Sequence, residues 1–147
     1  MKTLGSIVKN SARELYKVAA DATAQYAAEY MTARHIGAVT VVDGDRVVGL
    51  FSERDLMNRI VAKGLDPNAV TVGEVMTTEL VAGLSDDSCE EGIGKMRLAN
   101  CRHLPVLEGQ RFLGLISLRD LLQVEVDEQA EELRMLNTYI HYIPPGL

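Results

Sequence analysis

The sequence predicts a mixed α/β (α+β) fold made of two βαββα repeats, and three observations support this prediction. The chain matches itself at an offset of 65 residues, so that residues 44–56 fall on residues 109–121. In each copy the hydrophobic period changes from that of a helix to that of strands and back. The composition, 47% hydrophobic and 24% charged over 147 residues, is that of an ordinary globular protein.

Two short matching segments mark where the copies begin. Residues 4–8 resemble residues 72–76 at an offset of 68 residues, which places a three-residue loop insertion near residues 10–13 of copy one. We therefore expect a single module over residues 1–147, with repeat one at 4–71, repeat two at 72–126 and a tail at 127–147.

The first helix of each copy is expected after a short strand, which in copy one covers residues 15–18. Asp21 and Asp86 occupy matching positions and are the candidate N-caps. Apolar residues follow at helical spacing: Ala24, Ala27, Ala28 and Met31 in copy one, and Cys89, Ile93 and Met96 in copy two.

A β-hairpin is expected after each of these helices. In copy one, β-branched runs at residues 38–42 and 46–51 flank a turn at Asp43-Gly44-Asp45. Copy two repeats this pattern at residues 104–107 and 112–116.

Helical spacing also predicts a second helix and a helical tail. The second helix of copy one is expected to start near Ser52, to stop at Gly64, and to present Leu56, Ile60 and Val61. From Asp127 onward, a tail helix places Leu133, Leu136 and Ile140 on one face and ends at Pro144-Pro145-Gly146. We expect this tail to pack on its own module, with packing on a partner subunit as the alternative.

Charge and composition argue against several classes of function. A net charge of −6, 5% aromatic residues and the absence of a basic run disfavour nucleic acid and anionic membranes as ligands. No nucleophile lies beside a base, and no residues have metal-ligand spacing, so neither a catalytic nor a metal site is expected. Cys89 and Cys101 are expected to be reduced, buried thiols. The N-terminal residues lack a secretory signal, so we expect a cytoplasmic protein.

The repeated motif Gly-Leu-hydrophobic-Ser-x-Arg-Asp, at residues 49–55 and 114–120, has two interpretations. Ser52 with Asp55, like Ser117 with Asp120, has the spacing of a capping box, which needs no ligand. The alternative is an anion site, because a helix start offers free N–H groups and Arg54 or Arg119 adds a cation. The carboxylate could then accept the hydrogen bonds of a ribose diol.

On these residues the chain resembles the cystathionine-β-synthase (CBS) domain family, as a stand-alone tandem pair or Bateman module. The motifs that carry the resemblance are residues 49–56 and 114–121, the segment 102–106, and the linker 72–77. The resemblance implies a pseudo-two-fold pair with two clefts for adenosine ligands such as AMP, ADP, ATP, NAD or S-adenosylmethionine. It also implies a homodimer.

The resemblance further implies a role for each motif residue. Asp55 and Asp120 would hold ribose hydroxyls, Ser52 and Ser117 would contact ribose or phosphate, and Arg54 and Arg119 would bind phosphate. The adenine pocket would be lined by Ile36, Gly37 and Ala38 in copy one, and by Arg102, His103, Leu104 and Pro105 in copy two. Arg102 and His103 could also reach phosphate, although His103 is equally consistent with an ordinary surface histidine.

We therefore expect a regulatory, non-enzymatic module that binds an adenine nucleotide (AMP, ATP or NAD) and needs no catalytic cofactor. Since the pair fills nearly the whole chain, its output is expected to pass through its dimer or an unknown regulated protein. The alternative is a constitutive dimerisation scaffold in which the Ser/Asp pairs only cap helices. Neither hypothesis includes a nucleic acid, membrane or metal partner.

Overall fold

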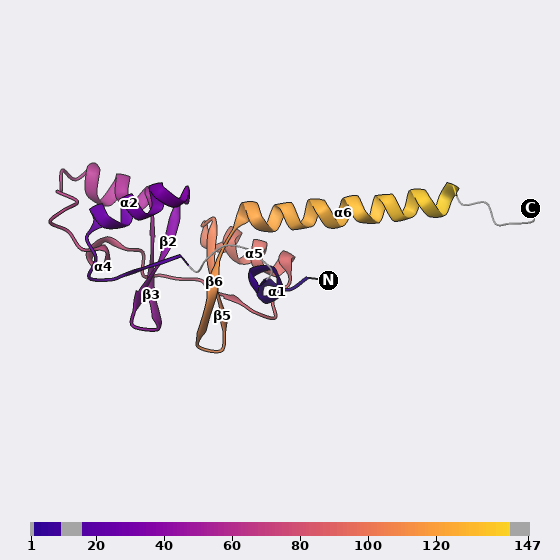
Figure 1. Ribbon diagram of the computed structural model, residues 1–147, viewed down its shortest axis with the longest axis horizontal. Coiled ribbons are helices and arrows are strands. Elements are labelled where there is room, and N and C mark those ends of the chain that lie inside the picture. Colours follow the sequence, from indigo (N-terminus) through magenta and orange to yellow (C-terminus); the bar gives the residue numbers. More distant parts are fainter. Residues whose placement is uncertain (1, 10–15, 142–147) are drawn as a thin grey trace, which may run out of the picture.

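Two three-stranded sheets, one in each copy, form the frame of the molecule (Figure 1). The computed structural model describes residues 2–9 and 16–141. In each sheet a short edge strand runs parallel to the middle strand, which pairs antiparallel with the third. Both hairpins shift register at the same place, between Val41 and Val42 and between Val106 and Leu107. The sequence repeat is therefore a repeat of topology, which confirms the mixed α/β prediction.

The elements of the two copies correspond in order, with the single helix α6 of copy two in the place of α3 and η1 of copy one. Copy one contains β1 (Lys17–Ala19), α2 (Ala24–Arg34), β2 (Ala38–Asp43), β3 (Arg46–Ser52), α3 (Glu53–Asp55) and η1 (Leu56–Val61). Copy two contains β4 (Gly83–Leu84), α5 (Cys89–Ala99), β5 (His103–Glu108), β6 (Arg111–Ser117) and α6 (Leu118–His141). Two short helices, α1 (Leu4–Lys9) and α4 (Val72–Val75), precede them. The expected loop at 10–13 and the start of the first expected strand lie outside the described residues.

The first helix of each copy starts later than the sequence suggested. Thr23 caps α2, since its side chain accepts a hydrogen bond from the Tyr26 amide at 3.0 Å. Ser88 caps α5 through the Glu91 amide at 3.1 Å. Asp21 and Asp86, the predicted N-caps, instead lie in the turns that leave the edge strands. A hydroxyl two residues further on is placed to reach the N3 amide, so it takes the capping role.

The second helix of copy one continues α3 into the π-helical turn η1. Its wider turn buries Ile60 completely but leaves Val61 66% exposed, so the expected core position of Val61 is wrong. The helix ends at Val61 with Ala62 as its C-cap, so it stops before the predicted Gly64, which lies in the following turn with a φ of +69°.

The two short helices are exchanged between the copies. The α1 amide of Leu4 donates to the Asp87 carbonyl at 2.9 Å, and the Leu4 side chain is fully buried in the core of copy two. The α4 amide of Val72 donates to the Ala22 carbonyl at 2.8 Å, and Val72 is fully buried in the core of copy one. Each core is therefore completed by the segment that begins the other repeat. We call each sheet with the helices packed on it a lobe. The boundary between the sequence repeats, at residues 71 and 72, is therefore not the boundary between the two lobes.

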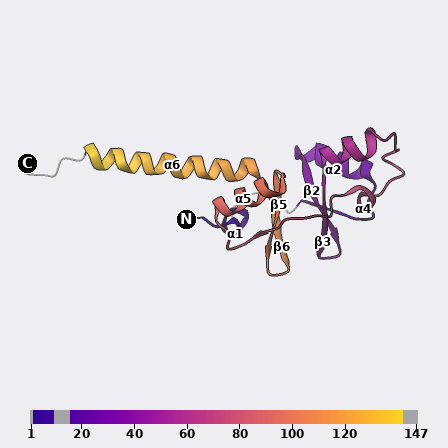
Figure 2. The same ribbon diagram turned by 180° about the vertical axis from the view of Figure 1, so that it is seen from behind.

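Helix α6 is one continuous helix of 24 residues. It contains both the second helix of copy two and the predicted tail, so the expected boundary at residue 127 falls inside it. Beyond the lobe, α6 projects away from the body of the molecule (Figure 1 and, from behind, Figure 2). Leu133 and Leu136 are 62% and 56% exposed, so the tail does not pack on its own module as predicted. In the described part of the chain, no helix has the length and apolarity needed to cross a membrane.

Candidate functional site

A cleft of about 1050 Å³ lies between the two copies. Eight of the predicted binding residues line it: Ile36, Gly37 and Ala38 from copy one, and Arg102, His103, Ser117, Arg119 and Asp120 from copy two. The other four predicted residues, Ser52, Arg54, Asp55 and Pro105, are not among the residues that line this cleft. The sequence analysis placed one adenine pocket in each copy, whereas the structure brings the lining segments of both copies to one cleft.

The copy-two wall is built where β6 runs into α6. The Ser117 amide donates to Asp120 Oδ2 at 3.0 Å, and the Asp120 amide donates to Ser117 Oγ at 3.0 Å. These reciprocal bonds are the predicted capping box. The Leu118 amide donates to the Arg102 carbonyl at 2.7 Å, which holds the segment before β5 beside the helix start. A hydroxyl, a carboxylate and two arginines are thereby gathered at the N-terminal end of a helix.

The copy-one wall is built where α2 ends and β2 begins. His35 ends α2 in the left-handed conformation, with a φ of 54°, and its amide points back to the Met31 and Thr32 carbonyls. Gly37 then approaches the start of α3, because the Glu53 amide donates to the Gly37 carbonyl at 3.0 Å. A Cβ on Gly37 would lie 3.0 Å from Glu53 Oε1, so a larger residue would displace that side chain from the cleft.

Several lining residues were missed by the sequence analysis. They include Lys2, Ile7 and Val8 near the N-terminus, Tyr16 before β1, Arg34 at the end of α2, and Glu53. Ile7 and Val8 belong to α1, which reaches the cleft only because it packs on copy two. No local sequence signal marks these residues, since each is brought to the cleft by tertiary packing.

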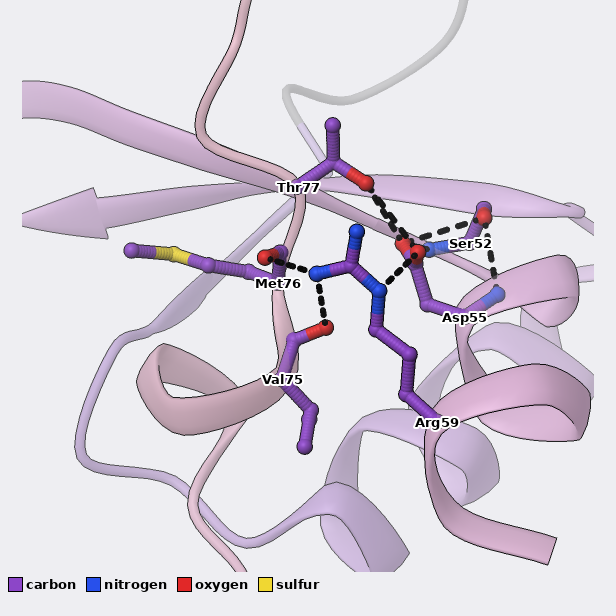
Figure 3. A network of polar contacts seen from close by, with 6 residues as sticks. All are labelled: Ser52, Asp55, Arg59, Val75, Met76 and Thr77. Carbon is purple, nitrogen blue, oxygen red and sulfur yellow. Dashed lines mark hydrogen bonds and ion pairs between the residues drawn. The ribbon is translucent and has the colours of Figure 1, made fainter. Parts of the chain in front are cut away.

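Asp55 lies in a network of polar contacts within the protein (Figure 3), whereas Asp120 lines the cleft. Asp55 is only 7% exposed, and its Oδ2 accepts hydrogen bonds from the Ser52 amide at 3.0 Å and the Ser52 hydroxyl at 3.1 Å. Its Oδ1 accepts a hydrogen bond from the Thr77 hydroxyl at 3.0 Å. Both carboxylate oxygens therefore have partners within the protein.

Arg59 extends this network from the helix to the linker (Figure 3). Its Nε lies 3.6 Å from Asp55 Oδ1, and its Nη1 donates to the Met76 carbonyl at 2.8 Å. Thr77 itself pairs with Leu50 at the edge of β3 through two backbone hydrogen bonds of 2.8 and 2.9 Å. In copy two the position of Arg59 is taken by Val124, so the same anchor cannot form there.

The remaining predicted residues, Pro105 and Arg54, do not line the cleft. Pro105 is fully buried in β5, opposite Leu115, and Arg54 is exposed on α3.

Cys89 is buried, and burial together with the nearby Glu125 and Glu128 carboxylates raises the pKa of its thiol. A thiol with a raised pKa stays protonated and unreactive at neutral pH, in keeping with the expected structural role.

The comparison with known families agrees with this architecture. Residues 6–62 and 72–127 each match the family model of the CBS domain. The chain belongs to the CBS domain family. The matched ranges correspond to the two repeats, so the protein is a tandem CBS pair.

Curated CBS proteins are similar along much of the chain. CBS domain-containing protein YhcV of Bacillus subtilis is 28% identical over 134 residues, which cover 91% of this chain and 95% of that protein. The mitochondrial CBS domain-containing protein CBSX3 of Arabidopsis thaliana is 30% identical over 125 residues, 82% of this chain. The matched region spans 61% of CBSX3.

Solved CBS structures have the same fold. A putative signal-transduction protein with CBS domains from Burkholderia ambifaria superposes with a TM-score of 0.81 at 33% identity, covering 87% of this chain and 96% of that one. The CBS domain protein PAE2072 of Pyrobaculum aerophilum, solved in complex with AMP, gives a TM-score of 0.69 at 25% identity, covering 78% and 88%.

Another CBS structure of similar fold contains metal. Hypoxic Response Protein I, solved with two coordinated zinc ions, gives a TM-score of 0.71 at 30% identity, covering 84% of this chain and 98% of that one. Within residues 2–9 and 16–141 of the present CBS pair, no group of three His, Cys, Asp or Glu side chains could hold a metal ion.

Proposed function

We propose that this CBS pair is a regulatory module that binds an adenine nucleotide in the cleft lined by Asp120. The observation that carries the proposal is the meeting of Ser117, Asp120 and Arg102 at one helix start inside that cleft. A carboxylate suits a ribose diol, and a helix start with arginines suits phosphate, so one nucleotide would use both. The AMP complex of the related PAE2072 supports the choice of ligand class.

Regulation would follow from the position of the cleft. Its walls come from both copies, so a bound nucleotide would favour one arrangement of the two lobes over others. A change in the lobes, or in a dimer of the chain, would then alter affinity for a regulated protein partner. No step of this proposal requires catalysis.

A homodimer is also part of the proposal, and we assign its contact to α6. Leu122, Val126, Leu133 and Leu136 follow the spacing of a coiled-coil seam and are 47% to 62% exposed. A second copy of the chain presents the same apolar seam, so a two-fold pair of α6 helices would be self-complementary. A scaffold that dimerises without any nucleotide response is the competing function, and this exposed seam is the observation that favours it.

Thermal unfolding with and without AMP, ADP, ATP, NAD and S-adenosylmethionine tests the nucleotide proposal. A ligand at about 100 times its Kd stabilises the folded state by about 2.7 kcal/mol, which raises the thermal midpoint. We expect such a rise for the wild type and for Asp45→Asn, a control in the exposed hairpin turn. Asp120→Asn keeps the shape of the side chain but removes its charge, so we expect the rise to be lost. A wild type that responds to none of the five ligands would favour the scaffold.

A further inference from the structure

We infer that the cleft selects nucleotides with two or more phosphates, and that Arg34 at the end of α2 is the residue that discriminates them from a monophosphate. The inference rests on the proposed nucleotide site and specifies its ligand. Arg34 belongs to copy one and lines the same cleft as Ser117 and Asp120 of copy two. With a ribose at Asp120 and a first phosphate at the helix start beside Arg102 and Arg119, Arg34 is left to bind a further phosphate.

The cleft carries an excess of positively charged side chains. Four cations line the cleft, Lys2, Arg34, Arg102 and Arg119, against the carboxylates of Glu53 and Asp120. Across residues 2–9 and 16–141, none of these four cations forms an ion pair with a carboxylate. The whole chain carries a net charge of −6, so the excess of positive charge is local to this cleft. Such a site favours an anion of higher charge than a phosphate monoester, which carries about −1.5 to −2.

The Arg34 side chain is held in place by Tyr30. Its Nη1 donates to the Tyr30 carbonyl at 3.1 Å, and its guanidinium carbon lies 3.5 Å from the centre of the Tyr30 ring. Tyr16, which also lines the cleft, has its ring centre 6.0 Å from the same carbon. A guanidinium positioned by a carbonyl and stacked on a ring loses little freedom when it binds a ligand. Its remaining N–H groups can serve a phosphate in a planar, bidentate manner.

The cleft is large for a small-molecule site. Its volume of about 1050 Å³ is at the limit of the range of such pockets, which is about 300–1,000 Å³. A nucleoside monophosphate would leave part of this volume empty, whereas added phosphates would fill more of it. The excess of cations and the size of the cleft therefore both favour a ligand longer than a monophosphate.

Isothermal titration of the full chain with adenosine, AMP, ADP and ATP tests the inference. We expect ATP to bind the wild type about tenfold more tightly than AMP, because an extra charge-assisted contact forms. In Arg34→Gln, affinity for ATP should fall about tenfold while affinity for AMP changes less than about twofold. Arg97→Gln is the matched control, since Arg97 is also exposed in the last turn of a helix, α5, but does not line the cleft.

Arg34→Lys tests whether a weaker affinity for ATP in Arg34→Gln comes from the lost charge or from a loss of folding. It keeps the positive charge but lacks the planar guanidinium, so we expect an affinity for ATP between those of the wild type and Arg34→Gln, with a ligand-free thermal midpoint close to that of the wild type. A folded lysine variant as defective as Arg34→Gln would overturn the electrostatic role of Arg34. Equal affinity of the wild type for AMP and ATP, or equal effects of Arg34→Gln and Arg97→Gln, would overturn the inference but leave the nucleotide site intact. Failure of all four ligands to bind would overturn both proposals.

Discussion

At the scale of single residues, the two matching aspartates of the repeat have different surroundings. Asp120 lines the cleft and closes a capping box with Ser117. Asp55 is buried and accepts hydrogen bonds from Ser52 and Thr77, with the Arg59 guanidinium beside it. The same motif therefore supports a carboxylate that lines the cleft in copy two and an internal anchor for the linker in copy one.

Replacing these two aspartates should destabilise the protein to different extents. We expect Asp55→Ala to lower the free energy of unfolding by about 2–4 kcal/mol, because the buried carboxylate is lost and half-buried donors on Ser52 and Thr77 lose their acceptor. Asp120→Ala should cost less stability than Asp55→Ala, because Asp120 is only half-buried, while it should reduce nucleotide affinity strongly. Urea unfolding of both variants measures the difference. Equal losses of stability would contradict the distinction between the two positions.

At the scale of elements, α6 has a first part that packs in copy two and a later part that is exposed. Its first turns complete copy two, where Leu121 is fully buried in the core. Its later turns project from the lobe and expose Leu133 and Leu136. Apolar side chains regularly spaced along an exposed helix are typical of a helix that pairs with another.

The proposed dimer contact makes a direct prediction about α6. Leu133→Glu combined with Leu136→Glu would bury two charges in the seam, so we expect the chain to become monomeric. Met135→Glu is the control, because Met135 is 64% exposed but lies off the seam. Light scattering after size-exclusion chromatography gives the mass of each variant. A dimer that survives the double substitution would show that another surface holds the two copies together.

At the scale of the whole molecule, the two copies depend on each other for their cores. Helix α1 begins repeat one but buries Leu4 among the side chains of copy two. Helix α4 begins repeat two but buries Val72 and Val75 in copy one. The same exchange carries Ile7 and Val8 into the cleft. Each lobe therefore needs a segment from the other repeat to complete its core.

Leu4→Ala tests this exchange of segments. We expect a loss of about 2–5 kcal/mol, as for other large-to-small changes in a core, whereas Leu98→Ala at a 92% exposed site should have little effect. Hydrogen exchange should show weaker protection first in β5 and β6 of copy two. Earlier loss in β2 and β3, which belong to the same repeat as Leu4, would contradict the exchanged arrangement.

Most of the architecture was predictable because the signals are local. The hairpins follow from β-branched runs around Gly44 and Gly109, both of which adopt a φ of +62°. The capping boxes at Ser52 and Ser117 follow from the three-residue spacing to an aspartate. The N-caps at Thr23 and Ser88 were missed, because a candidate aspartate stood two residues earlier and only the path of the turn decides which side chain reaches the helix.

The sequence by itself determined that this protein is a duplicated α/β module, and it predicted binding residues of which eight line one cleft. Only the tertiary structure decided that α1 and α4 exchange cores, that Asp55 anchors the linker, and that Arg34 lines the same cleft as Asp120. The physical reason is the range of the interactions. Periodicity, turns and caps involve neighbours in the chain, whereas a cleft gathers side chains from segments that are distant in sequence and whose meeting depends on how whole elements pack.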